Sequence, residues 1–399
     1  MKISPRLFSI LVPWLMLRIV LSLIVLGASS ARPNTDLEKS VKAWPVSTPH
    51  DAWLKRVVLE PWRRWDTEYY EYIAERGYRR DDGTLQFHPL YPLLGRGASF
   101  LFAGNVTAGL LAVSSVSCVL FLLVFVRLAE LDLPQDDSQR AATLLLHAPM
   151  AVILFAPYSE GLFLLFSALT FLMARRGSWW MAAAAGGLAT LTRQQGIFLV
   201  LPLAWELWEW CGRDLAKVLR RWSSVASVLL IPASLLGWLG YRGLMFGDIV
   251  FDAHNPRTWV YGLLISKDAT QVVAEQRFDF PWNALADALR SSGTSTVFDL
   301  VLGAMFVAMF VAGGRALWRV RKSYVVYAAV ILLVSFSYNT GAFLPYMGLP
   351  RHCLLAFPLF LPMAIWARKP GVETALLGVG FLGMAVLAFS YAAKIFWVP

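Results

Sequence analysis

A short segment that combines acids with aromatic residues holds the side chains best suited to chemistry in this chain. It reads Trp65-Asp66-Thr67-Glu68-Tyr69-Tyr70, and the run Phe87-His88-Pro89-Leu90-Tyr91-Pro92 follows it. The Asp66 carboxylate is a candidate general base that takes the proton from a hydroxyl group as this group attacks an anomeric carbon. Trp65, Tyr69 and Tyr91 are candidates for stacking on the faces of a sugar, and His88 is a candidate for orienting it.

Asp66 also has a simpler interpretation, as an acid that stabilises the start of a helix. Within the segment 65–78, the spacing of the apolar and aromatic residues predicts a helix that begins at Trp65 and Asp66 and ends at Gly77. Acids are favoured in the first turn of a helix because their charge complements the helix dipole. An acid at the surface of a membrane, flanked by aromatic residues, suggests an enzyme that acts on a sugar carried by a lipid phosphate. Transfer of such a sugar expels phosphate, a good leaving group, so Asp66 as the only base is enough, whereas hydrolytic glycosidases need two carboxylates.

Glu68 raises the question of a metal ion, because Asp66 and Glu68 stand two positions apart. Two such carboxylates can share Mg²⁺ or Mn²⁺ through hard oxygen ligands. In a helix, however, residues two positions apart do not face each other. The cysteines have neither metal-ligand nor disulfide spacing. We therefore expect no cofactor, with a divalent cation as the alternative.

A second group of candidates stands at the ends of apolar stretches. Arg193 and Gln194 interrupt one such stretch, and an arginine at that depth usually has a function or a partner. Its planar guanidinium suits a bidentate clamp on the phosphate of a lipid carrier, and an ion pair with Glu160 is the alternative. Arg351-His352 is a further candidate for holding phosphate, or else an anchor at the membrane interface.

Composition identifies an integral membrane protein. The chain of 399 residues is 57% hydrophobic and 16% charged, with a mean hydropathy of +0.55. Soluble domains are about half apolar and a quarter charged. The excess lies in blocks long enough to cross a bilayer, which predicts an all-α polytopic protein rather than a β-barrel.

The position of the basic residues predicts the topology. The net charge of +10 does not indicate nucleic acid, because Lys and Arg are concentrated in short connectors, as cytoplasmic loops require. With the N-terminus in the cytoplasm, about eleven spans follow. They are expected near 7–28, 106–129, 141–157, 160–174, 179–192, 196–210, 223–245, 297–317, 323–338, 350–367 and 372–392.

Two external loops are expected within what we interpret as one membrane domain, 1–399. The first covers 29–104, and its segment 89–104 is expected to lie along the outer surface. The second covers 246–295 and contains Asp248, Asp252 and His254, polar residues of the kind that cap a site. Asp66, Glu160, Arg193 and Arg351 would then all stand on the external side.

These motifs resemble those of the GPI mannosyltransferase 2 (PIG-V-like) family. The resemblance rests on the external Trp-Asp-x-x-Tyr-Tyr and Pro-Leu-Tyr-Pro-Leu runs and covers about 62–200. His88 stands where we expect an aromatic residue. Two later stretches match as well: Ala156-Pro157-Tyr158-Ser159-Glu160-Gly161-Leu162-Phe163 and Gly187-Leu188-Ala189-Thr190-Leu191-Thr192-Arg193-Gln194-Gln195-Gly196.

The resemblance implies a GT-C-type fold and a membrane glycosyltransferase. It implies a polyprenyl-phosphate donor, mannose as the sugar, inversion, independence of metal, and Asp66 as the catalytic acid-base position. The acceptor is expected to be an extracytoplasmic lipid or glycan. The short chain and its use of Arg and Ala indicate a bacterial homologue in the plasma membrane.

The alternative from another class is a polytopic lipid or solute transporter or flippase. Such a protein needs ionisable groups near the middle of the membrane and is often built from internal repeats. Here the candidate groups gather at the outer ends of the spans, and no convincing repeat is visible. A glycosyltransferase therefore explains the sequence better.

Overall fold

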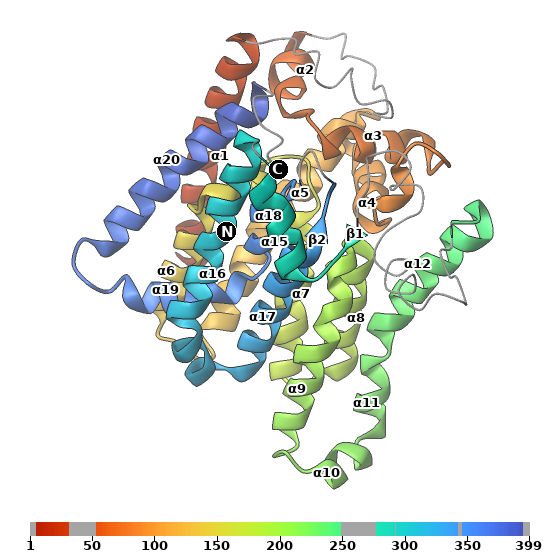
Figure 1. The fold of residues 1–399 in the computed structure, drawn as a ribbon, viewed down its shortest axis with the longest axis vertical. Coiled ribbons are helices and arrows are strands. Elements are labelled where there is room, and N and C mark those ends of the chain that lie inside the picture. Colours follow the sequence, from red (N-terminus) through yellow and green to blue (C-terminus); the bar gives the residue numbers. More distant parts are fainter. Residues whose placement is uncertain (1–4, 32–52, 249–276, 292, 342–344, 394–399) are drawn as a thin grey trace.

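The computed structural model describes residues 5–31, 53–248, 277–291, 293–341 and 345–393. This part of the chain is mainly helical (Figure 1). Its longer helices are α1 (Pro5–Ala31), α5 (Val106–Ala129), α6 (Gln135–Leu146), α7 (Glu160–Arg175), α8 (Trp179–Thr192), α9 (Val200–Trp210), α12 (Leu230–Phe246), α16 (Thr294–Val320), α17 (Lys322–Ser337) and α20 (Val372–Ala392).

Shorter elements connect and cap these helices. They are α2 (Trp53–Val58), α3 (Asp66–Arg76), α4 (Leu90–Ser99), α10 (Leu215–Arg220), α11 (Trp222–Val228), α15 (Pro281–Arg290), α18 (Leu349–Leu354) and α19 (Phe360–Trp366). Strands β1 (Arg277–Phe278) and β2 (Tyr338–Asn339) form one antiparallel pair. The 3-10 helices η5 (Pro149–Phe155) and η6 (Gln194–Leu199) precede α7 and α9. Most of the predicted loop 246–295, with Asp252 and His254, lies outside the described residues.

The predicted class, an all-α polytopic membrane protein, is confirmed. Five described helices are long and apolar enough to cross a membrane, or six if η5 and α7 count as one bent span. The expected spans 106–129 and 372–392 coincide with α5 and α20. The count of eleven spans is not confirmed.

Two expected spans are broken rather than continuous. The stretch 141–157 is divided between α6 and η5, and the axes of η5 and α7 differ by 100°. The stretch 350–367 is divided between α18 and α19. Prolines explain both breaks, because a proline removes a helical N–H donor and clashes with the preceding turn. The prolines concerned are Pro149 and Pro157, which border η5, and Pro358, which lies between α18 and α19.

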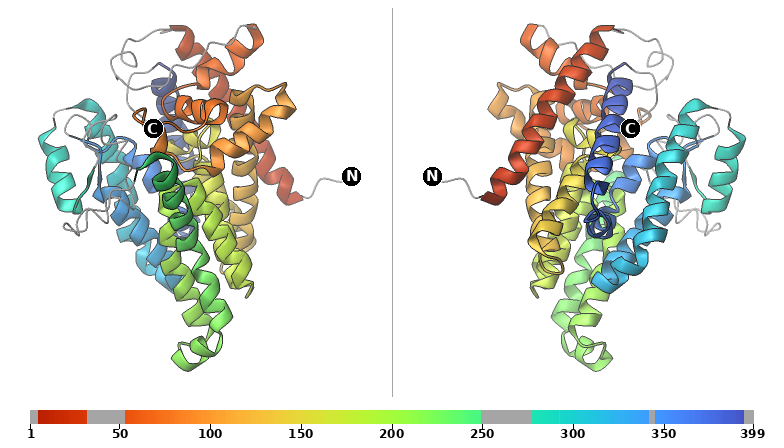
Figure 2. Two further views of the ribbon diagram at one scale, coloured as in Figure 1. Left: turned by 90° about the vertical axis from the view of Figure 1, so that its right-hand side faces the viewer. Right: turned by 90° about the vertical axis from the view of Figure 1, so that its left-hand side faces the viewer.

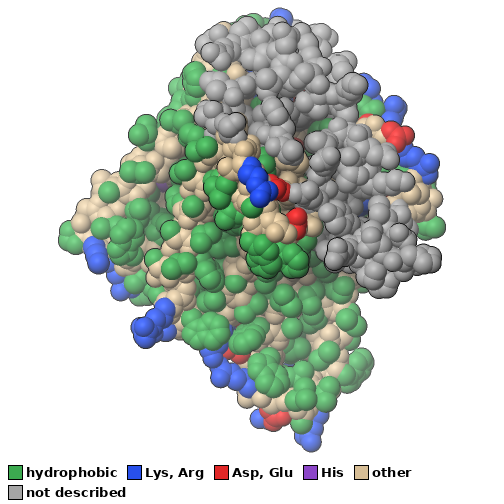
Figure 3. Space-filling model, in the orientation of Figure 1, with side chains coloured by type: hydrophobic (Ala, Val, Ile, Leu, Met, Phe, Trp, Pro, Cys, Tyr) green, Lys and Arg blue, Asp and Glu red, His purple; other side chains and the backbone are tan. Residues whose placement is uncertain are grey.

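Hydrophobic side chains cover much of the described surface in the left and lower part of Figure 3, and several lysines and arginines lie along the lower edge. The first helix shows the same property, since Met16 and Leu23 are 65% and 64% exposed. An apolar surface of this extent is typical of a protein in contact with lipid. The pair α9 and α11, joined by α10, extends beyond the rest of the bundle (Figures 1 and 2).

The central helices pack closely where small residues face each other. A Cβ atom on Gly109 of α5 would lie 2.3 Å from the carbonyl oxygen of Gly95 in α4. Only glycine permits this approach, which brings α4 across the start of α5. Helices α5, α7 and α8 pack in sequence behind it and contribute many buried apolar residues to the core.

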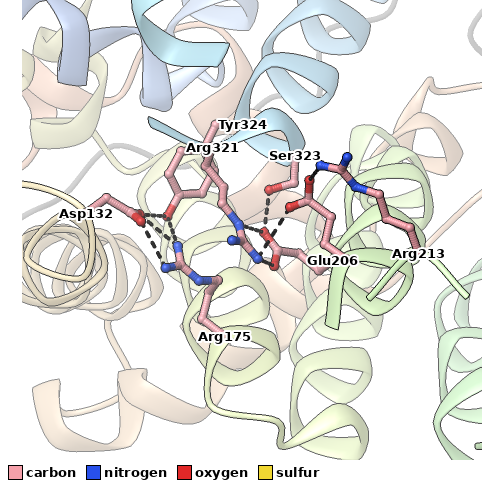
Figure 4. A network of polar contacts seen from close by, with 8 residues as sticks. Asp132, Arg175, Glu206, Arg213, Arg321, Ser323 and Tyr324 are labelled. Carbon is pink, nitrogen blue, oxygen red and sulfur yellow. Dashed lines mark hydrogen bonds and ion pairs between the residues drawn. The ribbon is translucent and has the colours of Figure 1, made fainter. Parts of the chain in front are cut away.

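Ion pairs tie the basic connectors together at one end of the bundle (Figure 4). Arg175 contacts Asp132 at 2.7 Å, and Arg321 contacts Glu206 at 2.5 Å. These four residues come from four different connectors or helix ends. Arg175 also donates to the Tyr324 hydroxyl at 3.3 Å, so the connectors at Arg175 and Arg321 lie close together. That all basic connectors share one end, and which side of the membrane this end faces, stay predictions.

Candidate active site

Helix α3 begins at Asp66 and ends before Gly77, as the sequence predicts. The preceding Trp65 has a φ of +55°, a conformation that costs a bulky residue on the order of 1–3 kcal/mol. Its side chain is only 3% exposed, so core packing holds this turn in place. The Asp66 backbone N–H donates to the Tyr158 hydroxyl at 3.1 Å, and that hydroxyl donates to the Arg64 carbonyl at 3.2 Å. The start of α3 is thus fixed against the loop before α7.

Four charged side chains from distant segments form a chain of alternating sign. Arg351 Nη1 donates to Asp66 Oδ2 at 2.5 Å and lies 3.8 Å from Glu160 Oε1. Arg193 Nη1 donates to the same Glu160 oxygen at 2.7 Å. The structure therefore contains the Arg193–Glu160 pair that the sequence left open, and it adds the contact with Asp66.

The four charged side chains differ strongly in how deeply they are buried. Glu160 is fully buried, whereas the Asp66 side chain is 20% exposed. Burial alone would lower the pKa of Arg351, but the charges of Asp66 and Glu160 outweigh it and raise this pKa. Arg351 consequently stays cationic and holds a positive charge against the Asp66 carboxylate.

Each of the two arginines has a side-chain nitrogen that forms no hydrogen bond with the described residues. The Nε atoms of Arg193 and Arg351 and the Oε2 atom of Glu160 are buried, and none has a hydrogen-bond partner in the part of the chain that the structure describes. Buried polar groups are normally paired, so unpaired donors next to each other indicate a place for an acceptor-rich ligand. Two guanidinium groups suit an anion such as phosphate.

Tyr158 and Ser159 also belong to the site, although the sequence analysis assigned them no role. Ser159 is fully buried, receives a hydrogen bond from Arg193 at 3.0 Å, and lies 2.8 Å from the Tyr70 hydroxyl. The Tyr158 ring stands under Arg351, with 5.6 Å between the guanidinium carbon and the ring centre. Their position next to Glu160 was the signal that could have identified them.

Gln194 and His352 meet in one small pocket beside the arginines. Gln195, Phe198, Phe278 and Tyr338 line it as well. The sequence predicted Gln194 and His352 as substrate contacts without any indication that they face each other. Each directly follows one of the two arginines in the sequence, whereas none of the four charged side chains of the site lines the pocket.

Three predicted aromatic contacts lie inside the protein. Tyr91 is fully buried, and its hydroxyl contacts the Leu110 carbonyl at 3.0 Å and Ser114 at 2.8 Å. Tyr69 and Trp65 are each 3% exposed, and the Tyr69 ring stacks on another aromatic ring. The structure therefore gives these residues a packing role, and it does not present their ring faces to a sugar.

His88 is buried as well, at 6% exposure, with its ring 5.9 Å from that of Trp238. Burial and the nearby positive charge of Arg242 lower the pKa of His88 to about 3. The ring is neutral at physiological pH and its Nδ1 has no partner among the described residues. It can accept or donate a hydrogen bond but does not supply a positive charge.

The described residues contain no group of three or more His, Cys, Asp or Glu side chains that could hold a metal ion. Asp66 and Glu68 both lie in the first turn of α3, where residues two positions apart point in different directions. The geometry gives no support to a shared metal at this pair.

The fold and the site together define an α-helical membrane protein with a largely buried acid–arginine centre. A family model described as mannosyltransferase (PIG-V) matches residues 11–231, more than half of the chain. The chain belongs to this family. The match confirms the resemblance drawn from the sequence.

Solved structures resemble the chain more distantly. ArnT from Cupriavidus metallidurans, bound to undecaprenyl phosphate, is 16% identical with a TM-score of 0.49; the match covers 94% of this chain and 63% of that one. The Archaeoglobus fulgidus oligosaccharyltransferase in its apo form is 14% identical with a TM-score of 0.47, covering 95% and 56%. The chain thus spans less than two thirds of these structures. No curated protein gives a significant match.

Proposed function

We propose that this protein is a membrane glycosyltransferase that moves one sugar, mannose, from a polyprenyl-phosphate donor to an extracytoplasmic lipid or glycan acceptor. The observation that supports this most is the series of side-chain contacts that runs from Asp66 through Arg351 and Glu160 to Arg193. In it the partly exposed Asp66 carboxylate contacts Arg351, and Glu160 links Arg351 to Arg193; the Nε atom of each arginine has no partner among the described residues. The family match supports the choice of mannose.

In the proposed reaction Asp66 is the general base. The acceptor hydroxyl oxygen attacks the anomeric carbon of the donor, and its proton passes to the Asp66 carboxylate. The bond between the anomeric carbon and the phosphate oxygen breaks, and its electron pair leaves with the polyprenyl phosphate. Attack opposite to the leaving group inverts the configuration. One base is sufficient because phosphate is a good leaving group.

Arg193 and Arg351 are proposed to hold the phosphate. Negative charge grows on this group as the bond breaks, and donors fixed in place stabilise such charge most effectively. Glu160 holds both guanidinium groups and so acts as a positioning residue. Since Arg351 also contacts Asp66 at 2.5 Å, it is proposed to link the base to the leaving group.

We further propose that the whole chain is a single membrane domain of a bacterial plasma membrane. The N-terminus and the basic connectors would face the cytoplasm, with the acid–arginine centre on the outer side. Support comes from the gathering of the connectors at one end and of the candidate site residues elsewhere. The positive-inside preference then assigns the sides.

The test is transfer by purified protein from labelled polyprenyl-phosphate mannose, with a membrane lipid extract as the source of acceptors. We expect incorporation of label into acceptors and release of an equal amount of polyprenyl phosphate. Absence of transfer from mannose and from other polyprenyl-phosphate sugars, by well-folded protein, would overturn the proposal. Counterflow of labelled substrate in liposomes would then favour a transporter.

A further inference from the structure

Arg18 is a charged residue near the middle of the first predicted span, and it takes no part in the proposed reaction. The helix that carries it, α1, is one of the described helices long and apolar enough to cross a membrane. An arginine inside such a helix is costly, so it normally has a function or a partner. Among the described residues no carboxylate pairs with Arg18; its polar contacts are with a backbone carbonyl oxygen and an aromatic ring.

The first contact is with the break between η5 and α7. Arg18 Nη1 donates to the carbonyl oxygen of Phe155, the last residue of η5. Phe155 is fully buried, and Pro157, two positions later, has no backbone N–H to donate. A buried carbonyl at such a break needs a donor from elsewhere, and a cation suits it because the carbonyl end of a helix carries partial negative charge. One turn earlier in α1, the Trp14 ring stacks on the Phe155 ring with 6.0 Å between the ring centres.

The second contact is with the segment that leads to Asp66. The guanidinium carbon of Arg18 lies 4.8 Å from the centre of the Trp62 ring, a distance typical of a cation–π contact. Trp62 is 1% exposed, and its carbonyl oxygen accepts a hydrogen bond from the Tyr391 hydroxyl of α20 at 2.7 Å. Asp66 follows four positions later, at the start of α3. Arg18 therefore contacts both segments that lead into the site.

These two segments meet again at the site itself. Three positions after Phe155, the Tyr158 hydroxyl accepts a hydrogen bond from the Asp66 backbone N–H at 3.1 Å. Glu160, which contacts both arginines of the site, lies two positions further along the chain. A shift of either segment at Arg18 would therefore move the base relative to the side chains that are proposed to hold the phosphate.

We propose that Arg18 is a positioning residue, which ties the break before α7 to the segment before α3 and so fixes the base relative to the phosphate-holding side chains. The inference rests on the proposed function and deepens it, because it assigns a role in the reaction to a residue that touches no substrate. A misplacement of about 1 Å can slow a reaction about a hundredfold, so contacts remote from the reacting atoms can control turnover.

Steady-state kinetics with labelled polyprenyl-phosphate mannose and a membrane lipid extract test the assignment. Arg18→Met keeps an unbranched apolar side chain but removes the charge and the donor. We expect its turnover per folded molecule to fall about ten- to a hundredfold with the donor KM within about twofold of wild type, because alignment and not binding is lost. Arg18→Lys keeps a charge and a donor and should regain most of the lost turnover. Val25→Ala, at a buried position of the same helix, is the matched control: it should lower the melting temperature and leave turnover per folded molecule unchanged.

Several results would overturn the assignment. Wild-type turnover in folded Arg18→Met would mean that Arg18 serves stability alone, and a raised donor KM with unchanged kcat would mean that it acts in donor binding. An equal loss of turnover in Val25→Ala would mean that any loosening of α1 disturbs the site. Turnover in Arg18→Lys as low as in Arg18→Met would show that the charge and the donor are not what matters.

A variant that fails to fold does not end the test. If Arg18→Met does not fold, Arg18→Gln, which has an uncharged donor, is measured in its place, with the same loss of turnover expected. Failure of the wild-type protein to transfer sugar would instead refute the proposed function, and the role of Arg18 with it.

Discussion

At the scale of single residues, Asp66 and Glu160 are both carboxylates in contact with arginine, yet their environments predict different roles. Asp66 is 20% exposed and stands at the start of a helix, where a ligand can reach it. Glu160 is fully buried between Arg193 and Arg351. Removal of a partner from a buried ion pair is costly because it leaves an uncompensated charge.

Glu160→Gln should therefore reduce stability. The expected loss is on the order of 3–5 kcal/mol, since two buried guanidinium groups would lose their shared carboxylate. Thermal unfolding in detergent measures it. Glu75→Gln, an exposed acid of α3, is the control and should change little. Equal melting temperatures for wild type and Glu160→Gln would show that Glu160 does not hold the arginines.

His88 should make stability depend on pH. Its pKa is lowered to about 3 in the folded protein, mainly by burial, and is about 6.5 in an unfolded chain. Protons therefore bind the unfolded state more tightly. The stabilisation is complete above about pH 6.5 and is lost as the pH falls towards 3; about 2 kcal/mol is lost by about pH 5. His88→Gln should have a flatter acid limb of stability than wild type, and parallel curves would contradict this.

The four charged residues of the site could each be predicted from the sequence. Asp66, Glu160, Arg193 and Arg351 were all candidates, because charges at the ends of apolar stretches are conspicuous. Their mutual contacts could not be predicted, since the four come from segments up to 285 positions apart. Tyr91 shows the opposite case: a tyrosine beside an acid motif looks like a sugar contact, and only tertiary packing reveals that its ring is buried.

At the scale of elements, the site depends on breaks in helices. Helix α8 ends at Thr192, Arg193 adopts an extended conformation, and the chain resumes as η6 and α9. Gly196 makes the break possible, because a Cβ atom there would lie 2.3 Å from the Thr190 backbone nitrogen. The close return of the chain directs Arg193 towards Glu160.

Gly196→Ala should disturb the break and with it the site. The added methyl group would overlap backbone atoms that cannot move aside easily, at a cost of about 1–3 kcal/mol. Both the melting temperature and the turnover should decrease. Gly97→Ala is the matched control, since nothing lies within 4 Å of a Cβ atom at that position of α4. A Gly196→Ala variant with wild-type stability and turnover would show that the break tolerates a side chain.

Hydrophobic length predicted the continuous helices well. Helices α5 and α20 have the expected ends, because each is an uninterrupted apolar run between polar or glycine-containing turns. The same criterion failed at 141–157 and 350–367, where prolines divide apolar runs into short pieces. Apolar composition says that a segment is buried in lipid or protein, and it does not specify that the segment is one helix.

At the scale of the whole molecule, the acid–arginine centre and the connector network are separate groups of charges. Glu206 belongs to the network, is 2% exposed, and contacts Arg321 at 2.5 Å. It joins the end of α9 to the start of α17 (Figure 4). The network touches none of the residues proposed to act on substrate, so it should serve stability alone.

Glu206→Gln should consequently lower stability by about 1–3 kcal/mol, because Arg321 would keep only its longer contact with Glu209 at 3.6 Å, while turnover per folded molecule stays the same. Unfolding curves and the transfer assay measure the two quantities on one preparation. Asp136→Asn, an exposed acid at the same end, serves as the control. A change in the KM for the donor would mean that the network is coupled to the site.

The most direct test of the account is the turnover of Asp66→Asn. Asparagine keeps the size of the side chain and can still occupy the helix start, but it cannot take a proton. With labelled polyprenyl-phosphate mannose, we expect turnover per folded molecule to fall by about 10²–10⁴-fold. Asp81→Asn, an exposed acid beyond the same helix, should transfer normally. Full activity of folded Asp66→Asn would contradict the assignment of Asp66 as the base.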